Sequence, residues 1–315
     1  MGKEKRCDPA GRIKQRKGWS VLLAAATGIG AALLLLGLYD GGKAQALTAG
    51  GAAVLAGAGD IASCDSRGDG ATARLLGSMR GTVFAAGDNA YENGTLSEYR
   101  TCYDNNWGRF KNRTKPVLGN HEYITRGASG YFDYFGAAAG ERGKGYYSYN
   151  RGDWHIVALN SECEFLEGGC DRESPMVSWL KEDLAANPAR CTLAYFHRPL
   201  YSSGQNGNNP EMRPVWHALH AAHADVIVSG HDHIYERFAR QTPRGELSSQ
   251  GIREFVVGTG GASHGKFKSV RDNSQVRNAN TYGVLKLRLR PKNYSWRFVP
   301  VEGKTFTDSG TTRCT

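Results

Sequence analysis

The chain has 315 residues, of which 40% are hydrophobic and 22% are charged, a composition that indicates a globular protein. Half of its net charge of +10 lies in residues 1–46, which carry eight Lys and Arg against three Asp and Glu. The remainder is mildly basic, which suits an anionic substrate. This charge is too modest to indicate nucleic-acid binding, and no basic stripe with interleaved aromatic residues is evident.

Residues 1–46 have the features of an export signal. Basic residues precede an apolar run from Val21 to Leu38, and Ala44-Gln45-Ala46 forms a small-x-small cleavage site. We therefore expect a signal peptide that is cut after Ala46, and a secreted or cell-envelope protein. The alternative is an uncleaved membrane anchor, because the run is about long enough to span a bilayer, although glycines interrupt it.

The cysteines agree with export. Cys7 lies in the leader, which leaves an even number in the rest of the chain: Cys64, Cys102, Cys163, Cys170, Cys191 and Cys314. An even count in an exported protein favours disulfides, and the absence of CxxC argues against a zinc–thiolate or redox site. Cys163 and Cys170 enclose a glycine-containing loop and are the clearest pair. Cys64–Cys102 and Cys191–Cys314 are guesses among many pairings.

Residues 47–315 are expected to form a single α/β domain without linkers or internal repeats. Apolar runs that are typical of buried strands lie at Ala53–Ala58, Thr82–Ala86, Trp154–Leu159, Thr192–Phe196, Val226–Val228 and Phe255–Val257. They alternate with helical segments at Ala71–Met79, Leu96–Asn105, Pro175–Ala185 and Pro210–Ala221. Near the C-terminus, Tyr282–Leu289 and Tyr294–Val299 alternate in polarity and predict a hairpin.

Five short motifs rich in metal-binding or phosphate-binding residues follow one another along this domain. They are Gly59-Asp60, Gly87-Asp88-Asn89-Ala90-Tyr91, Gly119-Asn120-His121-Glu122, His197 and Gly230-His231-Asp232-His233. Each lies just past the C-terminal end of an expected strand, with Asn120 following the apolar stretch Pro116-Val117-Leu118. Ligands of open α/β sheets gather at this edge. We therefore expect the motifs to meet in space. Their side chains suffice for two metal ions side by side, a common device for cleaving phosphate esters.

Asp88 is the expected bridge between the two metal ions, because it is central in the best-defined motif and a bridging carboxylate holds cations about 3.5–4 Å apart. Asn120 offers a neutral carbonyl oxygen. His231 and His233 alternate, so an extended backbone would point them to opposite sides. A loop would instead allow each His to reach a different metal ion.

The order GD…GDxxY…GNHE…H…GHxH resembles the calcineurin-like metallophosphoesterase superfamily, and Tyr91 narrows the resemblance to the purple acid phosphatases. The resemblance covers about Val54 to Ser263. It implies a metallophosphoesterase fold, a four-layer α-β-β-α sandwich of two mixed sheets flanked by helices. It also implies Fe(III) paired with a divalent Fe, Zn or Mn. Carried over by position, Asp60, Tyr91 and His233 would hold the ferric ion, Asn120, His197 and His231 the divalent ion, and Asp88 would bridge them.

One departure from the wider superfamily supports Tyr91 as a ligand. Most members have a His two residues after the first Asp, whereas this chain has Ala62, which cannot ligate. Tyr91 would replace that ligand as a phenolate, a hard anionic oxygen that suits Fe(III). The alternative is a Tyr that only packs.

The resemblance implies hydrolysis of a small phosphorylated molecule, in which a metal-bound hydroxide attacks phosphorus in line. His121, next to Asn120, would contact the phosphate or protonate the leaving group. Glu122 would orient the turn that carries Asn120 and His121.

A second departure concerns the loop Arg198–Asn209. Related enzymes often place one or two His there to hold phosphate, and this loop has none. Arg198, Gln205 and Asn206 are the candidates to replace them. The departure leaves the acid pH optimum and the monoester preference open. A phosphodiesterase acting on cyclic nucleotides, nucleic-acid ends or lipid headgroups is the runner-up, and a non-catalytic binding protein is a third hypothesis.

The remaining candidates are weaker. His217, His220 and His223 recur at helical spacing and are expected on a solvated helix side, and His155 is expected to be structural. Gly258-Thr259-Gly260-Gly261 follows a strand but lacks the Lys and helix of a nucleotide-binding loop. We expect it to line the cleft wall, with His264 as a contact at the rim.

Overall fold

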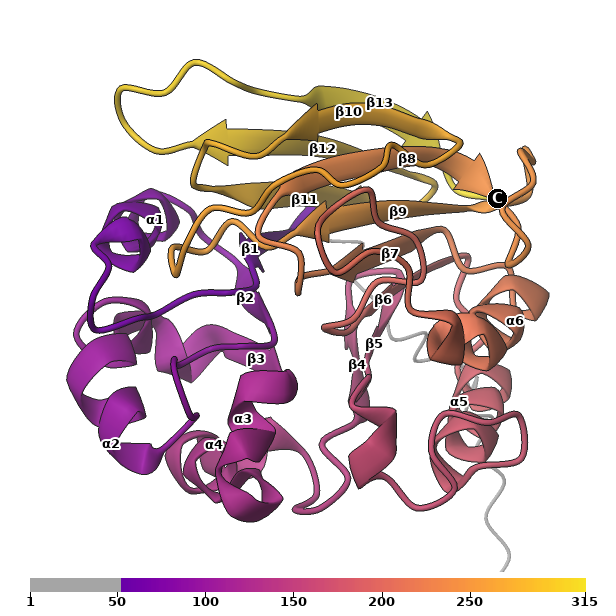
Figure 1. Cartoon of the computed structure of the whole chain (residues 1–315). Helices are drawn as coiled ribbons and strands as arrows, with labels where there is room; N and C mark the ends of the chain where they lie inside the picture. Colours follow the sequence, from indigo (N-terminus) through magenta and orange to yellow (C-terminus); the bar gives the residue numbers. More distant parts are fainter. Residues whose placement is uncertain (1–51) are drawn as a thin grey trace, which may run out of the picture. The chain divides into compact units, whose positions relative to one another are not determined.

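The computed structural model describes residues 52–315, so the expected leader and its cleavage site lie outside the described residues. Two sheets stack face to face between two groups of helices (Figure 1). One group comprises α1 (Gly68–Gly77), α2 (Leu96–Glu98), α3 (Asn120–Ile124) and α4 (Ser129–Phe135), and the other α5 (Pro175–Ala186) and α6 (Arg213–Ala221). The expected four-layer sandwich is confirmed. Within residues 52–315, no helix has the length and apolar character needed to cross a membrane.

The first sheet has six strands in the order β13-β12-β11-β1-β2-β3. Its parallel half consists of β1 (Ala53–Ala58), β2 (Thr82–Ala86) and β3 (Thr114–Val117). Its antiparallel half consists of β11 (Gly283–Arg290), β12 (Asn293–Pro300) and β13 (Ser309–Arg313). The expected C-terminal hairpin is therefore present as β11–β12, and β11 also pairs with β1.

The second sheet has seven strands in the order β10-β8-β9-β7-β6-β5-β4. Four of them run parallel: β5 (Trp154–Ala158), β6 (Cys191–Tyr195), β7 (Val226–Ser229) and β9 (Ile252–Val257). The antiparallel strands are β4 (Tyr147–Arg151), β8 (Tyr235–Gln241) and β10 (Ser274–Asn278). The sheet is therefore mixed, like the first.

The main hydrophobic core lies between the two sheets and includes buried side chains from both. Tyr235 of one sheet contacts Phe298 of the other, with ring centroids 4.5 Å apart. At one end the backbones also meet, because the Gly59 amide donates a hydrogen bond to the Val257 carbonyl at 2.9 Å. This close approach brings the ends of β1 and β9 together at the edge where the motifs lie.

The segment Leu96–Asn105 differs from the single α-helix expected there. One α-helical turn, α2, is followed by a π-helix at Tyr99–Tyr103. Tyr99 is fully buried and stacks on Tyr134 with ring centroids 4.9 Å apart. Its hydroxyl also reaches the buried Glu122 at 2.9 Å. These tertiary contacts favour a local winding that sequence periodicity does not predict.

All three disulfides that the sequence suggested are present: Cys64–Cys102, Cys163–Cys170 and Cys191–Cys314. The last joins β6 to the segment after β13 and so connects the two sheets at the end away from the motifs. Its sulfurs are bonded to each other, so the nearby Asp225 does not form a metal site with them.

Candidate metal centre

The five motifs converge at the C-terminal ends of parallel strands, as expected. Asp60, Asp88 and Asn120 follow β1, β2 and β3 of the first sheet. His197 follows β6 of the second sheet, and both His231 and His233 follow β7. Each sheet thus contributes half of a single cluster.

Tyr91 is the centre of one group of polar atoms. Its hydroxyl lies 3.0 Å from Asp60 Oδ1 and 3.1 Å from Asp88 Oδ2. It also lies 3.1 Å from His233 Nε2, which in turn is 3.2 Å from Asp60 Oδ1. This group contains the side chains that the sequence assigned to one metal ion.

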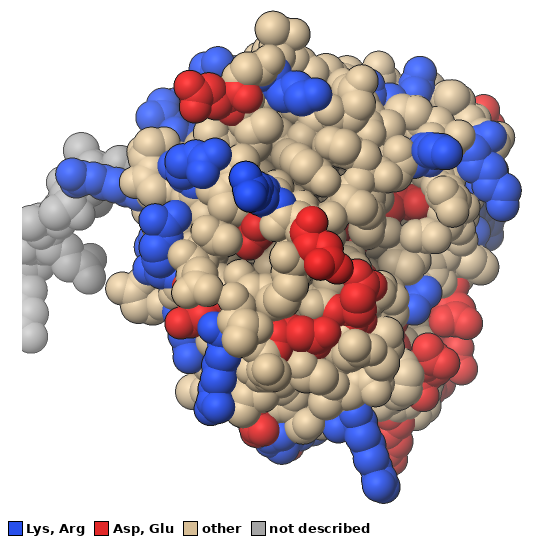
Figure 2. Space-filling view, turned by 60° about the vertical axis from the view of Figure 1, so that its left-hand side comes forward, with Lys and Arg blue, Asp and Glu red and all other residues tan. Residues whose placement is uncertain are grey.

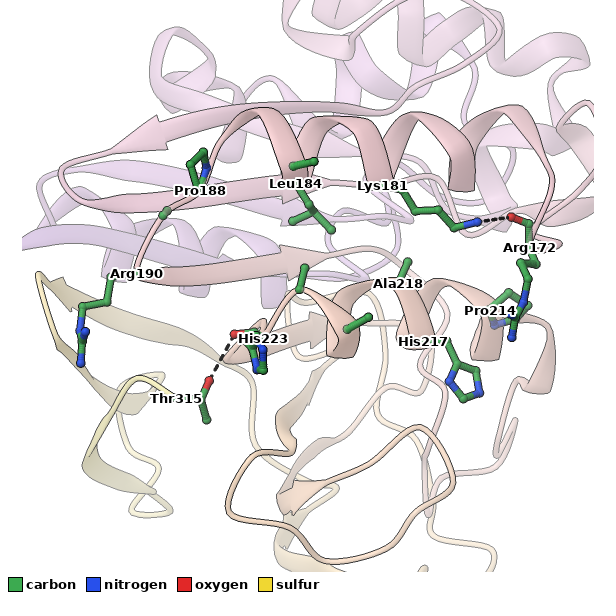
Figure 3. A pocket seen from close by; sticks show the side chains of 14 residues that line it. Arg172, Lys181, Leu184, Pro188, Arg190, Pro214, His217, Ala218, His223 and Thr315 are labelled. Carbon is green, nitrogen blue, oxygen red and sulfur yellow. Dashed lines mark hydrogen bonds between the residues drawn. The ribbon is translucent and has the colours of Figure 1, made fainter.

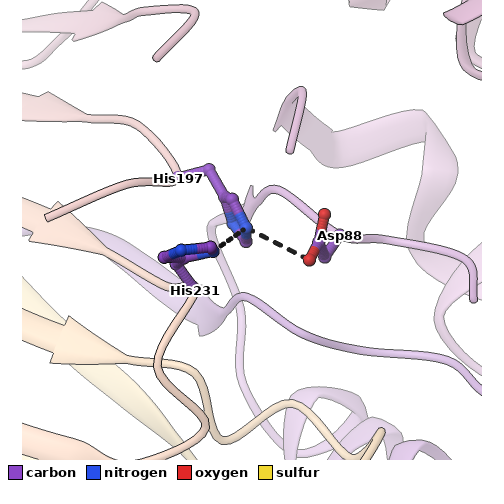
Figure 4. Close-up of side chains that lie close together, drawn as sticks. All are labelled: Asp88, His197 and His231. Atoms are coloured by element: carbon purple, nitrogen blue, oxygen red, sulfur yellow. Dashed lines mark hydrogen bonds and ion pairs between the residues drawn. The ribbon is translucent and has the colours of Figure 1, made fainter. Parts of the chain in front are cut away.

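His197 is the centre of a second group (Figure 4). Its Nε2 atom lies 3.1 Å from Asp88 Oδ2 and 3.2 Å from Asn120 Oδ1. His231 Nδ1 approaches the same nitrogen at 3.2 Å. Asp88 Oδ2 therefore belongs to both groups, and His231 and His233 are directed to different ones.

The backbone at this edge is held in an uncommon conformation. Asp60, Asp88 and His231 have φ angles of 58°, 48° and 69°, in the left-handed region that non-glycine residues seldom adopt. Such residues cost on the order of 1–3 kcal/mol each and persist where the surrounding structure fixes them. Among residues 52–315, three of the six non-glycine residues with positive φ are candidate ligands.

Buried partners fix the orientation of the cluster. Glu122 is fully buried and accepts hydrogen bonds from the amides of Asp88, Asn89 and Gly119 at 2.9, 2.8 and 2.7 Å. It therefore orients the turns that carry Asp88 and Asn120, the role expected from the sequence. The ring nitrogens that face away from the cluster are also held: His197 Nδ1 lies 2.9 Å from the Ala86 carbonyl, and His233 Nδ1 lies 2.6 Å from Ser263 Oγ.

Burial and neighbouring charges shift the pKa values of several residues in the cluster. Burial alone would raise the pKa of Asp88, but the adjacent His197 holds it below its usual range. Burial would lower the pKa of His197, yet Asp88 and Asp60 raise it to about 10. Burial and the neighbouring carboxylates raise the pKa of Tyr91 well above its ordinary value.

This donor set fits metal ions. Carboxylate, phenol, amide and imidazole atoms lie 3.0–3.2 Å from one another, and shared protons hold them in place. A cation at either position would replace those protons and lower the pKa of the Tyr91 phenol. Tyr91 also occupies the space beside Asp60, where Ala62 provides no ligand atom.

His121 lies at the edge of the cluster. Its backbone amide donates to Asp88 Oδ1 at 2.9 Å, and its ring packs against Tyr91 with centroids 4.3 Å apart. Its Nδ1 atom lies 2.5 Å from the Glu92 carbonyl. Because a carbonyl only accepts, Nδ1 carries a proton, and Nε2 faces Asp88 Oδ2 at 3.9 Å.

The four other candidate substrate contacts differ in what they can offer. Arg198 is 28% exposed and uses Nε for a 2.8 Å ion pair with the buried Glu162, which leaves its terminal nitrogens available. Asn206 donates its side-chain amide to the His231 carbonyl at 3.0 Å, so that amide supports His231. Gln205 is exposed. His264 is exposed and stacks on Tyr282 with centroids 3.9 Å apart.

Three supporting residues were not found from the sequence. Ser161 Oγ accepts from the amides of both His197 and Arg198. Asp232 holds the loop that begins at Arg198, through Ser202 Oγ at 2.5 Å and the Asn206 amide at 2.8 Å. Ser263 bonds to His233, as described above. Only Asp232 had a local signal, since it lies inside the fifth motif.

The weaker candidates lie outside the cluster. His155 is buried between Asn150 and Asp183, at 2.8 and 2.7 Å, and is structural. His217 and His223 line a groove of about 1020 Å³ between α5 and α6 (Figure 3), away from the C-terminal strand ends where the motifs lie. The Gly260 amide bonds to the Gly59 carbonyl at 2.9 Å, so the glycine-rich segment lies against the Asp60 turn.

Charges of both signs share the face shown in Figure 2, which brings the left-hand side of Figure 1 forward. Asp and Glu gather near the middle of this face, and Lys and Arg lie mostly around its margin. The mild positive charge of the chain is therefore not concentrated there.

Comparison with known proteins agrees with the geometry. The profile of the calcineurin-like phosphoesterase family matches residues 70–235. Purple acid phosphatase 18 of Arabidopsis thaliana is 30% identical over 135 residues, 41% of this chain and 30% of the relative. Purple acid phosphatase 15 of the same plant is 30% identical over 175 residues, 49% of this chain and 32% of the relative. The matched part of the chain thus spans about a third of the length of these relatives.

A solved structure shows the same fold. The purple acid phosphatase from yellow lupin (Lupinus luteus) seeds superposes with a TM-score of 0.63 at 20% sequence identity, covering 82% of this chain and 53% of the lupin chain. Since the family profile covers more than half of its residues, the chain belongs to the calcineurin-like phosphoesterase family.

Proposed function

We propose that this chain is an exported two-metal phosphohydrolase that cleaves phosphate monoesters in the manner of the purple acid phosphatases. The observation that carries the proposal is the pair of ligand groups that share Asp88 Oδ2. Asp60, Tyr91 and His233 would hold one metal ion, for which the phenolate favours Fe(III). Asn120, His197 and His231 would hold the other, a divalent Fe, Zn or Mn.

Bound metal ions supply Lewis acidity and lower the pKa of the attacking water. The chain's own residues position the substrate and move protons. His121 presents Nε2 beside Asp88, where it can hold a proton for the leaving oxygen. The free terminal nitrogens of Arg198 can bind two phosphate oxygens, since Glu162 fixes the guanidinium through Nε. The guanidinium of Arg198 and the imidazole of His121 would thus bind the phosphate and serve the leaving oxygen of a monoester.

The disulfides support the export part of the proposal. Three of them lie within residues 52–315, and such bonds form and persist in oxidising compartments. The residues that would direct export are those of the basic and apolar leader described from the sequence.

The first experiment compares initial rates on p-nitrophenyl phosphate and bis-p-nitrophenyl phosphate, using protein that begins at Leu47 and whose metal content has been measured. A large preference for the monoester is expected. A preference for the diester would replace the monoesterase by a phosphodiesterase on the same site. No turnover of either ester by metal-loaded protein would favour a binding protein.

Replacing the shared ligand tests the two-metal site directly. Asp88→Asn should lower kcat/KM by more than about 100-fold, because losing even an indirect partner of a metal ligand costs 10–100-fold. The protein should remain folded by circular dichroism and bind less metal. Asp153→Asn, in the exposed turn between β4 and β5, is the matched control and should behave as wild type. Full activity of Asp88→Asn would contradict the proposal.

A further inference from the structure

Most of the large apolar side chains that are exposed lie on segments at the sheet edge that carries the candidate metal centre. Five such side chains are more than a third exposed in the part of the chain that the structure describes: Ile124, Phe165, Leu247, Phe267 and Val270. All except Leu247 lie on segments that follow the C-terminal ends of strands, the edge where the ligands gather. Leu247 lies in the turn between β8 and β9, at the opposite end of the sheet. Apolar groups grouped at one site are typical of a binding surface.

Among these side chains, Phe165 packs on the helix that carries two of the candidate site residues. The residue is 46% exposed, and its ring lies parallel to that of Tyr123, with centroids 4.1 Å apart and planes inclined by 2°. Tyr123 is on α3, the short helix that also carries Asn120 and His121. Ile124, the next residue, is 58% exposed. Phe165 therefore packs on the helix of the site and still exposes nearly half of its surface to solvent.

Hydrogen bonds and a disulfide hold Phe165 in this position. Asn160 donates to the Tyr123 hydroxyl at 2.8 Å, and its neighbour Ser161 accepts from the His197 amide at 3.1 Å. Glu162 then pairs with Arg198 at 2.8 Å. The Cys163–Cys170 disulfide closes the loop that carries Phe165. The loop that holds Phe165 therefore also carries Ser161 and Glu162, the residues that contact His197 and Arg198.

We propose that the Tyr123–Phe165 pair is a stacking platform for a planar aromatic ring on the leaving group of the substrate. This inference rests on the proposed function and names its substrate class. Hydrolysis breaks the P–O bond to the alcohol of that group, with a water hydroxyl going to phosphorus and a proton to the leaving oxygen. The aromatic ring can be an aryl group joined directly to that oxygen, or a nucleobase joined through a sugar. Stacking on an aromatic side chain accepts either, because both present a π-face.

The test measures kcat/KM on phenyl phosphate, adenosine 5′-monophosphate and glycerol 3-phosphate. Phe165→Ala should lower kcat/KM about tenfold, mainly through KM, on at least one aromatic substrate, which is the size of effect that stacking produces. Its value on glycerol 3-phosphate should change less than about twofold by the same reasoning. A loss on phenyl phosphate alone identifies an aryl substrate, and a loss on the nucleotide identifies a nucleobase.

Matched variants separate stacking from other effects. Phe165→Trp keeps a planar ring and should retain the aromatic preference, whereas Phe165→Leu keeps apolar volume and should lose it. Leu247→Ala removes an even more exposed apolar side chain far from the site and should change nothing. The platform proposal would be overturned if Phe165→Ala lost as much kcat/KM on glycerol 3-phosphate as on the aromatic substrates. It would also be overturned if the variant lost none on either aromatic substrate.

A binding measurement distinguishes failure of the platform from failure of the proposed function. Titration calorimetry with phenylphosphonate and methylphosphonate, which have no ester bond to cleave, should show tighter binding of the phenyl compound by wild type and equal binding by Phe165→Ala. If wild type turns over none of the three esters, the proposed function fails, and calorimetry still decides whether the ring is bound. If phenylphosphonate binds no more tightly than methylphosphonate to wild type, the platform is wrong.

Discussion

Gly119 shows how little space the shared ligand has. A Cβ atom at this position would lie 2.3 Å from Asp88 Oδ1 and 2.5 Å from the Asp88 backbone nitrogen, closer than real atoms approach. Gly87 is constrained from the other side, because its φ is +80° and a Cβ there would lie 2.6 Å from the His197 ring. Glycine at these two positions lets the ends of three strands close around one carboxylate.

Gly119→Ala should therefore displace Asp88 while leaving every ligand in the chain. We expect a loss of bound metal and a fall in kcat/KM of at least about 10–100-fold, the range seen when a ligand loses its support. Metal per protein, measured by mass spectrometry, is the direct readout. Gly77→Ala is the control. Gly77 lies in α1, and the atom nearest to its added Cβ is 3.9 Å away. Unchanged metal content in Gly119→Ala would show that Asp88 relaxes freely.

The candidate ligands could be predicted because each motif is local in sequence and follows an apolar strand. Their supports could not, because they come from distant positions. Ser161 reaches His197 across 36 residues, and Ser263 reaches His233 across 30. The local sequence around either serine does not indicate such a partner.

At the scale of elements, the loop Arg198–Asn209 is shaped by buried carboxylates. Glu254, fully buried on β9, accepts from the Leu200 amide at 3.1 Å through Oε1, and its Oε2 has no partner within residues 52–315. Glu236 on β8 accepts from the Ser203 amide at 2.8 Å. Together with Asp232, these groups hold the loop that begins with Arg198.

Glu254 gives this loop a measurable pH dependence. Burial, with Glu236 nearby, raises the pKa of Glu254 well above its ordinary value of 4.5. Between pH 4.5 and this raised pKa, Glu254 keeps its proton in the folded state but has lost it in the unfolded state. The free energy of unfolding therefore falls as pH rises. Glu254→Gln stays neutral, and its unfolding free energy minus that of wild type should grow by about 1 kcal/mol or more from pH 4 to pH 7.

Urea unfolding at both pH values measures this difference. Glu302→Gln, at an exposed turn, is the control and should show a constant difference from wild type. A difference for Glu254→Gln that is flat, or that shrinks with pH, would mean that Glu254 is ionised in the folded protein.

Burial also decides which elements the sequence could predict. β1, β2 and β6 are apolar runs with mainly buried side chains, and their positions were found to within a residue or so. The edge strands β4, β10 and β13 were missed, and so was the interior strand β8, because all four carry several polar or half-exposed side chains that resemble those of loops. What places them is pairing with a neighbour, which is a long-range property.

At the scale of the whole molecule, the disulfides differ in the length of chain they constrain. Cys191–Cys314 closes a separation of 123 residues, whereas Cys163–Cys170 closes 7. Alanine at both positions of the first pair should lower the free energy of unfolding by about 4–5 kcal/mol, and at both of the second by about 2–3 kcal/mol, since a longer loop loses more unfolded-state entropy. Denaturant unfolding without reductant compares them. The reverse order would show that native contacts rather than chain entropy set the effect.

The position of β1 in its sheet has a consequence for the order of events as the protein is made. β1 lies in the interior of the first sheet, between β2 and β11, and its register pairs Ala53 with Leu289. β1 is the first strand of the domain to be synthesised, and β11 is one of the last. One edge of β1 therefore lacks its backbone hydrogen bonds until β11 has been made. Cys191 must likewise stay unpaired until Cys314 arrives, while Cys163 and Cys170 are already at hand. A chain that is stalled late in synthesis or translocation would thus present an open strand edge and a free thiol, the state most exposed to wrong pairing.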